Sequence, residues 1–245
     1  MNMLFLEKGG PHITIPRTDR RFEHIVRILR KKEGDFIAAG CSDGTIGLAR
    51  IGSISPEGLQ LSYTPEIQAP ALRPVRLLMG FPRPIQAGRI LKDLTSLGIA
   101  EIWFALSDLG EKSFAESTFF KEKEYGIHLI EGAEQAGNPR LPEIRCFWSI
   151  DRACARLDED ETASGRHSSR LLFHPDPTCP TIAALSALEP SVTLAIGSER
   201  GWSGRELSLL ASHGFQTCYL GDRILKTETA ALAAASMILS RFGFM

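Results

Sequence analysis

The chain has 245 residues, of which 43% are hydrophobic and 23% are charged, the balance of an ordinary globular protein. This length accommodates one large domain or two smaller ones, each with its own core. A net charge of −1 argues against a protein that holds nucleic acid through its overall charge. The sequence shows neither a signal-peptide pattern nor an apolar run of membrane-spanning length, so we expect a cytoplasmic protein without a membrane partner.

The cysteines and histidines give no sign of a metal site. The five cysteines lie far apart without a CxxC pair, and the six histidines lack the spacing of metal ligands. The wide separation also disfavours a disulfide scaffold. We therefore expect free thiols and no bound metal.

The first 70 residues have the pattern of a small β-barrel with an early helix. Residues 19–29 carry apolar side chains at helical spacing. Strands are expected at residues 36–39, 45–51 and 59–63, and Asp43-Gly44 is a hairpin signal between the first two. Residues 69–74 contain two prolines and are expected to form a linker.

The expected early helix is also the most basic part of the chain. Residues 17–32 contain seven basic and two acidic residues, a net charge of +5 on a chain whose total is −1. A concentrated basic patch on an otherwise acidic body is typical of a site that docks a polyanion. A solvated helix face without a partner is the alternative.

From residue 75 onward, strands and helices are expected to alternate. The expected strands are residues 75–79, 99–105, 171–173, 192–196 and 216–220. The expected helices are residues 85–97, 119–136, 203–212 and 228–242, whereas residues 151–170 are expected to be a helix end followed by a mobile loop. This alternation predicts an α/β fold with a mostly parallel sheet and flanking helices.

Local signals mark the ends of several of these helices. Gly98 suits a C-terminal cap, and Ser203 with Glu206 has the pattern of a capping box. Thr227 is expected to cap the last helix, whose alanine-rich face is narrow and smooth. Such a face can pack within its own subunit or against a second subunit, and the sequence leaves both possibilities open.

Two glycine-bearing loops directly follow two of the expected late strands. The first runs from Gly197 to Gly201, and the second runs from Leu220 to Arg223. The carboxyl ends of neighbouring parallel strands form the crevice in which α/β sheets usually bind ligands. The sequence therefore locates the functional site before it identifies the ligand.

At these loops the chain resembles the SPOUT-class RNA methyltransferases, and specifically the bacterial 16S rRNA uridine-N3 methyltransferase family (RsmE). Four stretches match that family in order and spacing, so the similarity covers nearly the whole chain. The most specific strings are Ile196-Gly197-x-Glu199-x-Gly201 and Leu220-Gly221-x-Arg223-Ile224-Leu225-x-Thr227-Glu228-Thr229-Ala230. The other stretches are His24-Ile25-Val26-Arg27-Ile28-Leu29-Arg30, Ser96-Leu97-Gly98-Ile99 and Ala133-Glu134-Gln135.

The resemblance implies a fold that the hydrophobic pattern alone would not suggest. It implies a PUA-like RNA-binding β-barrel over residues 1–70 and a SPOUT methyltransferase domain over residues 71–245. It further implies a deep trefoil knot, which most chains exclude, together with a homodimer and S-adenosyl-L-methionine bound at the knot. The implied substrate is 16S rRNA of the small ribosomal subunit, held by the barrel of one subunit and the catalytic domain of the other.

The resemblance also implies roles for individual residues. His24, Arg27 and Arg30 would contact RNA phosphates. A histidine at the position of His174 is, without the resemblance, more often a hydrogen-bonded turn residue than a catalyst. The residues implied at the cofactor are Leu172, Phe173, His174, Ile196, Gly197, Glu199, Gly201, Leu220, Gly221, Ile224, Leu225 and Thr229.

Methylation at uridine N3 requires a cation and a proton acceptor near the base. The N3 atom becomes a good nucleophile only after it loses its proton, and a cation near O2 or O4 would stabilise the developing anion. Arg223 and Arg140 are the candidates for the cation, and Glu228 is the candidate for the proton acceptor. The alternatives are a turn residue at the surface for Arg223 and a charge that complements the helix N-terminus for Glu228.

Several positions depart from the family pattern. Ser198 and Arg200 stand where proline and glycine are usual, and Lys226 stands where arginine is usual. A positive φ at Arg200 would cost about 1 kcal/mol of backbone strain. Two alternatives therefore stay open, namely a divergent RNA-binding paralogue without catalysis and a methyltransferase of a different RNA position.

Overall fold

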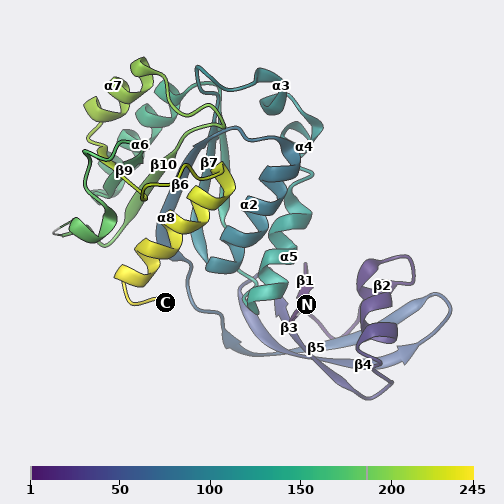
Figure 1. Ribbon diagram of the computed structural model, residues 1–245. Helices are drawn as coiled ribbons and strands as arrows, with labels where there is room; N and C mark the ends of the chain where they lie inside the picture. Colours follow the sequence, from purple (N-terminus) through teal and green to yellow (C-terminus); the bar gives the residue numbers. More distant parts are fainter. Residues whose placement is uncertain (1, 186) are drawn as a thin grey trace. The chain divides into compact units, whose positions relative to one another are not determined.

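The computed structural model describes residues 2–185 and 187–245 and divides into two compact units (Figure 1). The first unit comprises residues 2–71 together with Ile130–Leu141, and the second comprises Leu72–Leu129 and Pro142–Met245. The expected linker at residues 69–74 spans the division between the units. The sequence did not indicate that residues 130–141 would join the first unit.

The first unit contains a five-stranded sheet of order β1-β3-β4-β5-β2. β1 pairs in parallel with β3, and the other pairs are antiparallel. The three predicted strands correspond to β3, β4 and β5, whereas β1 and β2 are too short for an alternating pattern to reveal them. The strands are β1 (Leu4–Leu6), β2 (Ile13–Pro16), β3 (Phe36–Cys41), β4 (Thr45–Ile54) and β5 (Gly58–Gln68).

The early helix of the first unit combines two geometries. α1 (Arg20–Glu23) begins after Asp19, whose carboxylate accepts a backbone hydrogen bond at 2.9 Å. The helix continues as a wider π-helical turn, η1 (His24–Ile28). The predicted helix is therefore confirmed, although its π geometry was not expected. Its buried side chains join the core of the first unit: Phe22 and Ile25.

The C-terminal part of helix α5 (Gly126–Ala136) completes the first unit. The Glu134 carboxylate, 2% exposed, accepts a hydrogen bond from the Phe5 amide at 3.3 Å and one from the Arg20 guanidinium at 2.9 Å. The Glu134 carbonyl oxygen accepts hydrogen bonds from the amides of Asn2 and Met3. Strand β1 is therefore held by a residue that lies 129 positions after Phe5.

The second unit contains a six-stranded sheet of order β11-β9-β10-β6-β7-β8 in which every pair is parallel. This confirms the predicted parallel sheet and five of its strands. β8 was not predicted, because it lies at the sheet edge and mixes charged with apolar residues. The strands are β6 (Arg73–Gly80), β7 (Ile99–Ala105), β8 (Glu143–Phe147), β9 (Ser169–Phe173), β10 (Val192–Ile196) and β11 (Gln216–Cys218).

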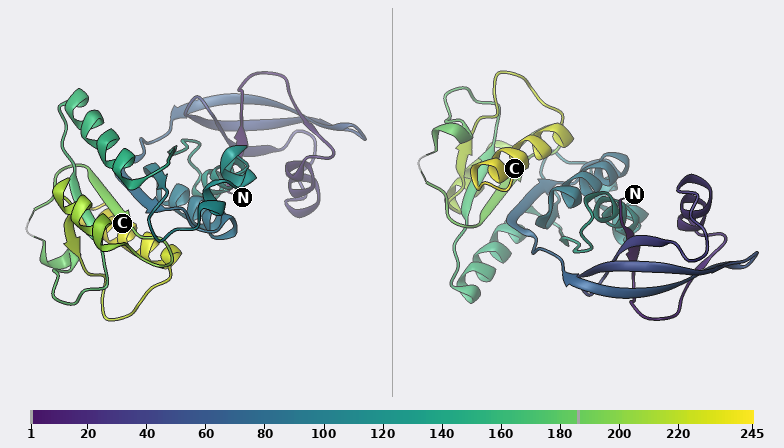
Figure 2. Two further views of the ribbon diagram at one scale, coloured as in Figure 1. Left: turned by 90° about the horizontal axis from the view of Figure 1, so that it is seen from above. Right: turned by 90° about the horizontal axis from the view of Figure 1, so that it is seen from below.

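Helices cover both faces of this sheet (Figures 1 and 2). α2 (Pro84–Leu97) and α8 (Thr227–Arg241) contact each other, and α8 also packs on β10 and β6. α6 (Ile150–Ser164) and α7 (Gly204–Ser212) form a second pair, with α6 against β7 and β8. The alanine-rich face of α8 is buried within this subunit. Three short helices lie in the connections: α3 (Lys112–Ala115), α4 (Thr118–Lys121) and η2 (Ile182–Ala184).

Two helical predictions were wrong in their extent. Residues 119–136 were expected to form one helix, but the chain breaks between α4 and α5, where Lys123 has φ +57°. Residues 151–170 were expected to be a helix end followed by a mobile loop, yet residues 151–164 belong to the complete helix α6, capped by the Ser149 side chain. The many charged residues of α6 obscured its apolar pattern in the sequence. Its buried face consists of Ile150, Ala153, Cys154 and Leu157.

The predicted helix ends are confirmed at two positions and wrong at one. Gly98 caps α2 with φ +79°, and Ser203 with Glu206 forms the capping box of α7. The cap of α8 is Lys226, whose side chain makes no capping hydrogen bond. Thr227 is instead the first helical residue, and its side chain is buried.

The five cysteines are free thiols. None of the helices in the described part of the chain has both the length and the apolar character needed to cross a bilayer. Within residues 2–185 and 187–245, no group of three or more His, Cys, Asp or Glu side chains is arranged to hold a metal ion.

Replacing Glu134 with alanine should destabilise the first unit. The change leaves the Phe5 amide without an acceptor and the Arg20 guanidinium without its partner, at a cost of about 1–3 kcal/mol in the free energy of unfolding. Glu23→Ala is the matched control, because it removes an exposed ion pair with Arg27 worth about 0.5 kcal/mol. Urea unfolding of the full chain measures both changes, and equal losses would contradict this role of Glu134.

Candidate functional site

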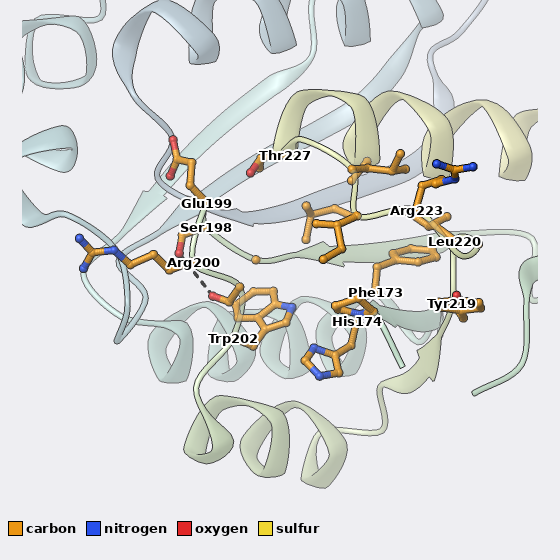
Figure 3. A pocket seen from close by; sticks show the side chains of 18 residues that line it. Phe173, His174, Ser198, Glu199, Arg200, Trp202, Tyr219, Leu220, Arg223 and Thr227 are labelled. Carbon is orange, nitrogen blue, oxygen red and sulfur yellow. Dashed lines mark hydrogen bonds between the residues drawn. The ribbon is translucent and has the colours of Figure 1, made fainter. Parts of the chain in front are cut away.

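A cavity of about 320 Å³ opens at the carboxyl ends of β9, β10 and β11 (Figure 3). The two glycine loops and the start of α8 contribute most of its lining. The crevice predicted from the sequence is therefore present, and both loops line the same hollow. The lining residues are 173–175, 196–202, 219–221, 223–225, 227 and 230.

The first glycine loop is a tight turn with no space for side chains at its base. The Gly201 amide donates a hydrogen bond to the Ser198 carbonyl oxygen at 2.8 Å, and Gly201 has φ +76°. A Cβ atom on Gly197 would lie 2.8 Å from the Gly201 carbonyl carbon, and one on Gly80 would lie 2.8 Å from the Ser198 amide nitrogen. Glycine is therefore required where the ends of β6 and β10 meet this loop.

Two charged side chains tie the first loop to neighbouring segments. A carboxylate oxygen of Glu199 accepts a hydrogen bond from the Arg83 amide at 3.2 Å. The Arg200 guanidinium pairs with the Glu111 carboxylate at 2.9 Å. Arg200 does not adopt a positive φ, so the strain considered for this position is not present. Its largely exposed side chain forms part of the cavity lining.

A buried carboxylate fixes the chain that follows the first loop. Glu206, fully buried at the start of α7, accepts hydrogen bonds from the Ser203 amide at 2.9 Å and the Asp108 amide at 2.8 Å. The Arg205 guanidinium hydrogen-bonds the Asp108 carboxylate and lowers its pKa below the usual value, with a further contribution from the Ser203 hydroxyl. These contacts hold the loop after β7 against the start of α7.

The second glycine loop carries the most exposed side chains of the lining. Gly221 has φ +120°, and no atom lies within 4 Å of the place where a Cβ would stand. Arg223 is 87% exposed, and its Nε atom lies 3.8 Å from an Asp222 carboxylate oxygen. Ile224 is 90% exposed. A cation held so weakly is available to a ligand or substrate at the cavity mouth.

Two buried ring nitrogens interrupt the otherwise largely apolar inner wall. Trp202 is 6% exposed, and its Nε1 atom has no hydrogen-bond partner among the residues that the structure describes. The same is true of Nδ1 of His174, and both rings line the cavity beside Phe173 (Figure 3). An unpaired buried N–H costs about 1–3 kcal/mol, so we expect a ligand that brings an acceptor. The lining fits a nucleoside-like ligand, which combines a planar apolar part with hydrogen-bonding groups.

Most of the cofactor residues implied by the family resemblance line this one cavity: Phe173, His174, Ile196, Gly197, Glu199, Gly201, Leu220, Gly221, Ile224 and Leu225. Leu172 does not, because neighbouring residues of a strand face opposite sides of the sheet. Its side chain is buried in the core between the sheet and the α6–α7 pair. Thr229 is exposed on α8 and also lies outside the lining, since Thr227 and Ala230 occupy the helix face toward the cavity.

Of the three predicted catalytic residues, only Arg223 lies in the cavity lining. Glu228 is half-buried in the first turn of α8, next to the lining residue Thr227, but is not part of the lining. Arg140 belongs to the first unit, where its Nε atom donates a hydrogen bond to the Ala69 carbonyl oxygen at 3.1 Å. Of the three, Arg223 is the residue whose position in the lining would let it contact a substrate in the cavity.

Trp202, Tyr219, Thr227 and Ala230 are among the lining residues that sequence reasoning did not assign to the cofactor. Trp202 and Tyr219 directly flank the glycine loops, and their aromatic character at that position was a usable signal. Thr227 and Ala230 were assigned to capping and helix packing instead. Their contribution depends on how α8 is rotated about its axis, which the sequence does not specify.

The basic helix of the first unit exposes part of its charge. Arg27 is 70% exposed and pairs with Glu23 at 3.0 Å, and Arg30 is exposed with φ +52°. Ile28, which lies between them in the sequence, is 65% exposed. His24 differs, because its Nε2 atom is buried without a partner in the described part of the chain. The helix thus presents two cations and an apolar side chain to solvent.

Comparison with known proteins finds matches over both units. A model of an RNA methyltransferase domain matches residues 69–239, and a model of an RNA methyltransferase PUA domain matches residues 18–62. A ribosomal RNA small subunit methyltransferase E of Treponema pallidum is 35% identical over 223 residues, which are 91% of this chain and 83% of that protein. A ribosomal RNA small subunit methyltransferase E 1 of Borreliella burgdorferi is 26% identical over 98% of each chain.

Solved structures share the fold over nearly the whole length. A ribosomal RNA small subunit methyltransferase E from Neisseria gonorrhoeae, bound to S-adenosyl methionine, has a TM-score of 0.76 at 20% identity and covers 98% of both chains. A putative methyltransferase from Legionella pneumophila, in complex with the same cofactor, has a TM-score of 0.79 at 22% identity and also covers 98% of both chains. At these identities the comparison establishes the fold.

Replacing Gly197 with alanine should open the first glycine loop. The new methyl group would lie 2.8 Å from the Gly201 backbone, and displacing that backbone should lower the free energy of unfolding by about 1–3 kcal/mol. Gly204→Ala is the matched control, because a Cβ there meets nothing within 4 Å. Urea unfolding compares the two variants, and a Gly197→Ala protein as stable as Gly204→Ala would show that the loop is not confined.

Proposed function

Because this chain belongs to the ribosomal RNA small subunit methyltransferase E family, we propose that it methylates N3 of a uridine in the 16S rRNA of the small ribosomal subunit. The observation that carries the proposal is the single cavity formed by both glycine loops at the ends of β9, β10 and β11. The names of the relatives support an rRNA substrate. We assign the activity to the cytoplasm, where small ribosomal subunits are assembled.

The proposed methyl donor is S-adenosyl-L-methionine, which two structures of the same fold contain. When bound, it would supply a methyl group already activated on a sulfonium centre. The backbone of residues 197–201 and 220–225 would surround the adenosyl part, since Gly201 and Gly221 leave open space there. The indole N–H of Trp202 has no hydrogen-bond acceptor among the described residues. It would donate a hydrogen bond to the bound S-adenosyl-L-methionine.

Arg223 is the residue that we propose stabilises negative charge on the substrate. Deprotonated uridine carries its charge on N3, O2 and O4, and an exposed, weakly paired guanidinium at the cavity can approach these atoms. Glu228 is the candidate for accepting the proton, although its position in the first turn of α8 also suits simple charge complementarity. A contribution from Arg140 would have to come from the first unit, in which its contacts lie.

We further propose that residues 1–70 form the RNA-binding domain and that residues 71–245 form the SPOUT methyltransferase domain. The match of residues 18–62 to the PUA model supports the first assignment. The exposed cations Arg27 and Arg30 would contact phosphates without reading the sequence. His24 would reach RNA only after its ring turns outward, since its Nε2 atom is buried.

A homodimer and a trefoil knot are proposed for the second unit. Large apolar side chains that a second subunit would cover support the dimer: Ile224 is 90% exposed, Ile85 is 75% exposed and Met237 is 37% exposed. Ile85 and Met237 belong to α2 and α8, which contact each other. The path of the chain supports the knot, because the chain returns from β11 at the sheet edge past β9 to place α8 on β10 and β6.

Calorimetry with S-adenosylhomocysteine tests the proposed cofactor. We expect the wild-type protein to bind, and we expect Trp202→Phe to weaken binding roughly three- to tenfold because a hydrogen bond is lost. Trp148→Phe is the matched control, since Trp148 lies outside the lining of this cavity and should leave binding unchanged. Absence of heat from the wild-type protein at high ligand concentration would instead favour a non-catalytic RNA-binding protein.

Nucleoside analysis tests the proposed reaction. Unmethylated small subunits incubated with the protein and S-adenosylmethionine should yield 3-methyluridine, and a different methylated nucleoside would contradict the assigned position. Arg223→Ala should lower kcat roughly 100-fold, because the developing anion loses its cation. Asp222→Ala removes an equally exposed neighbour and should change kcat little. A normal kcat for Arg223→Ala would exclude Arg223 from the mechanism.

A further inference from the structure

A second, smaller cavity opens at the other half of the same sheet edge. It measures about 140 Å³ and is lined by Phe81, Ala115, Phe120, Lys121 and residues 146–148. Phe81 directly follows β6, residues 146–148 lie at the end of β8, and the remaining residues come from α3 and α4. None of them lines the larger cavity at the glycine loops. We call this smaller cavity the aromatic slot.

The inner wall of the aromatic slot is held in place by the core. Phe81 and Phe120 are 3% and 6% exposed, and their ring centroids lie 4.8 Å apart at an interplanar angle of 86°. The fully buried Phe104 ring contacts both, at centroid distances of 5.8 and 5.0 Å. Rings packed in this way form a preorganised apolar surface rather than one that must assemble around a ligand.

The outer wall of the aromatic slot is Trp148, which is 51% exposed. The other two tryptophans, Trp103 and Trp202, are 0% and 6% exposed. Trp148 therefore leaves a large apolar ring face in water, where it contributes little to the core. An exposed aromatic ring beside a preformed apolar wall is a stacking surface for another planar ring.

The charges at the aromatic slot are compatible with a ligand that has an uncharged ring and an attached anionic group. Lys121 is exposed at the slot, and no carboxylate pairs with it among the described residues. The Cys146 side chain at the slot is a free thiol, which is mostly uncharged at neutral pH because an ordinary thiol pKa is about 8.5. The slot thus combines uncharged, mostly aromatic walls with one available cation.

The size and position of the aromatic slot favour one nucleobase over larger occupants. The volume of the slot is well below the roughly 300 Å³ at which small-molecule sites begin. The surface area of its single exposed aromatic ring is also far below the roughly 800 Å² that each partner buries in a stable protein interface. β8 lies three strands from β10, about 14 Å at the usual strand spacing. The slot is therefore within reach of an RNA strand that has one nucleotide at the glycine loops.

We propose that the aromatic slot binds an unpaired nucleobase of the substrate RNA, close to the methylated nucleotide, by stacking on Trp148 with the adjoining phosphate at Lys121. The proposal rests on the RNA substrate assigned above. Stacking of this kind tolerates any base, because every base has a π face. The slot therefore positions the RNA strand and leaves recognition of the target base to the glycine-loop cavity.

The test is the affinity of the full-length protein for a 16S rRNA transcript, measured by filter retention in the presence of S-adenosylhomocysteine. Trp148→Ala should weaken RNA binding roughly tenfold, and Trp148→Phe should restore most of the affinity. Lys121→Gln should reduce the slope of log affinity against log salt by about 0.7, the effect of one phosphate contact on a single strand. Phe244→Ala removes another exposed aromatic ring, 40% exposed and outside the slot, and should bind as wild type.

The readouts separate this proposal from the proposed function. Wild-type RNA affinity for Trp148→Ala, with S-adenosylhomocysteine binding and thermal stability intact, would overturn the aromatic slot even if the enzyme methylates rRNA. Conversion of Trp148→Ala to monomers would overturn it as well, because the slot would then belong to a subunit interface. Failure of the wild-type protein to methylate would refute the proposed function, whereas the comparison of RNA affinities would still decide the role of the slot.

Discussion

The first glycine loop lies so close to the ends of β6 and β10 that neither Gly80 nor Gly197 can carry a side chain there. A methyl group on Gly80 would meet the Ser198 backbone, and one on Gly197 would meet the Gly201 backbone, both at 2.8 Å. The first glycine loop therefore has one available path, and its side chains are directed to fixed places. Glu199 and Arg200 reach the segments after β6 and β7, while Trp202 turns its ring into the cavity. The shape of the site follows from this backbone contact.

The two edges of the parallel sheet differ in whether their polar side chains have partners. A cavity of about 370 Å³ at the amino ends of the strands is larger than the one at the glycine loops. Four of its charged side chains, however, form two ion pairs: Arg76 with Glu101 and Arg145 with Asp160, each at 2.8 Å. The carboxyl edge instead retains the unpaired ring nitrogens and the weakly held Arg223. Unmet hydrogen-bonding capacity, rather than volume, distinguishes the edge suited to a ligand.

The sequence predicted those parts of the fold and the site that depend on neighbouring residues. The apolar strands, the capping box at Ser203 and the two glycine loops each carry a local pattern, and all are present. Strand β1 was missed because its three residues are too few to show a pattern and its support, Glu134, is far away in the chain. Leu172, predicted at the cofactor, does not line the cavity, as strand alternation between Leu172 and Phe173 would suggest. Thr227 and Ala230 were missed because the rotation of a helix is set by its tertiary contacts.

Helix α5 begins in the second unit and ends in the first, so the boundary between the units is crossed by an unbroken helix. This arrangement has a consequence for biosynthesis. More than half of the chain is made before residue 134, and until then the amides of Asn2 and Met3, just before β1, and of Phe5, within it, lack their Glu134 acceptors. By that time β6, α2 and β7 have already been translated. The amino-terminal unit therefore cannot complete its own contacts until part of the second unit has been made.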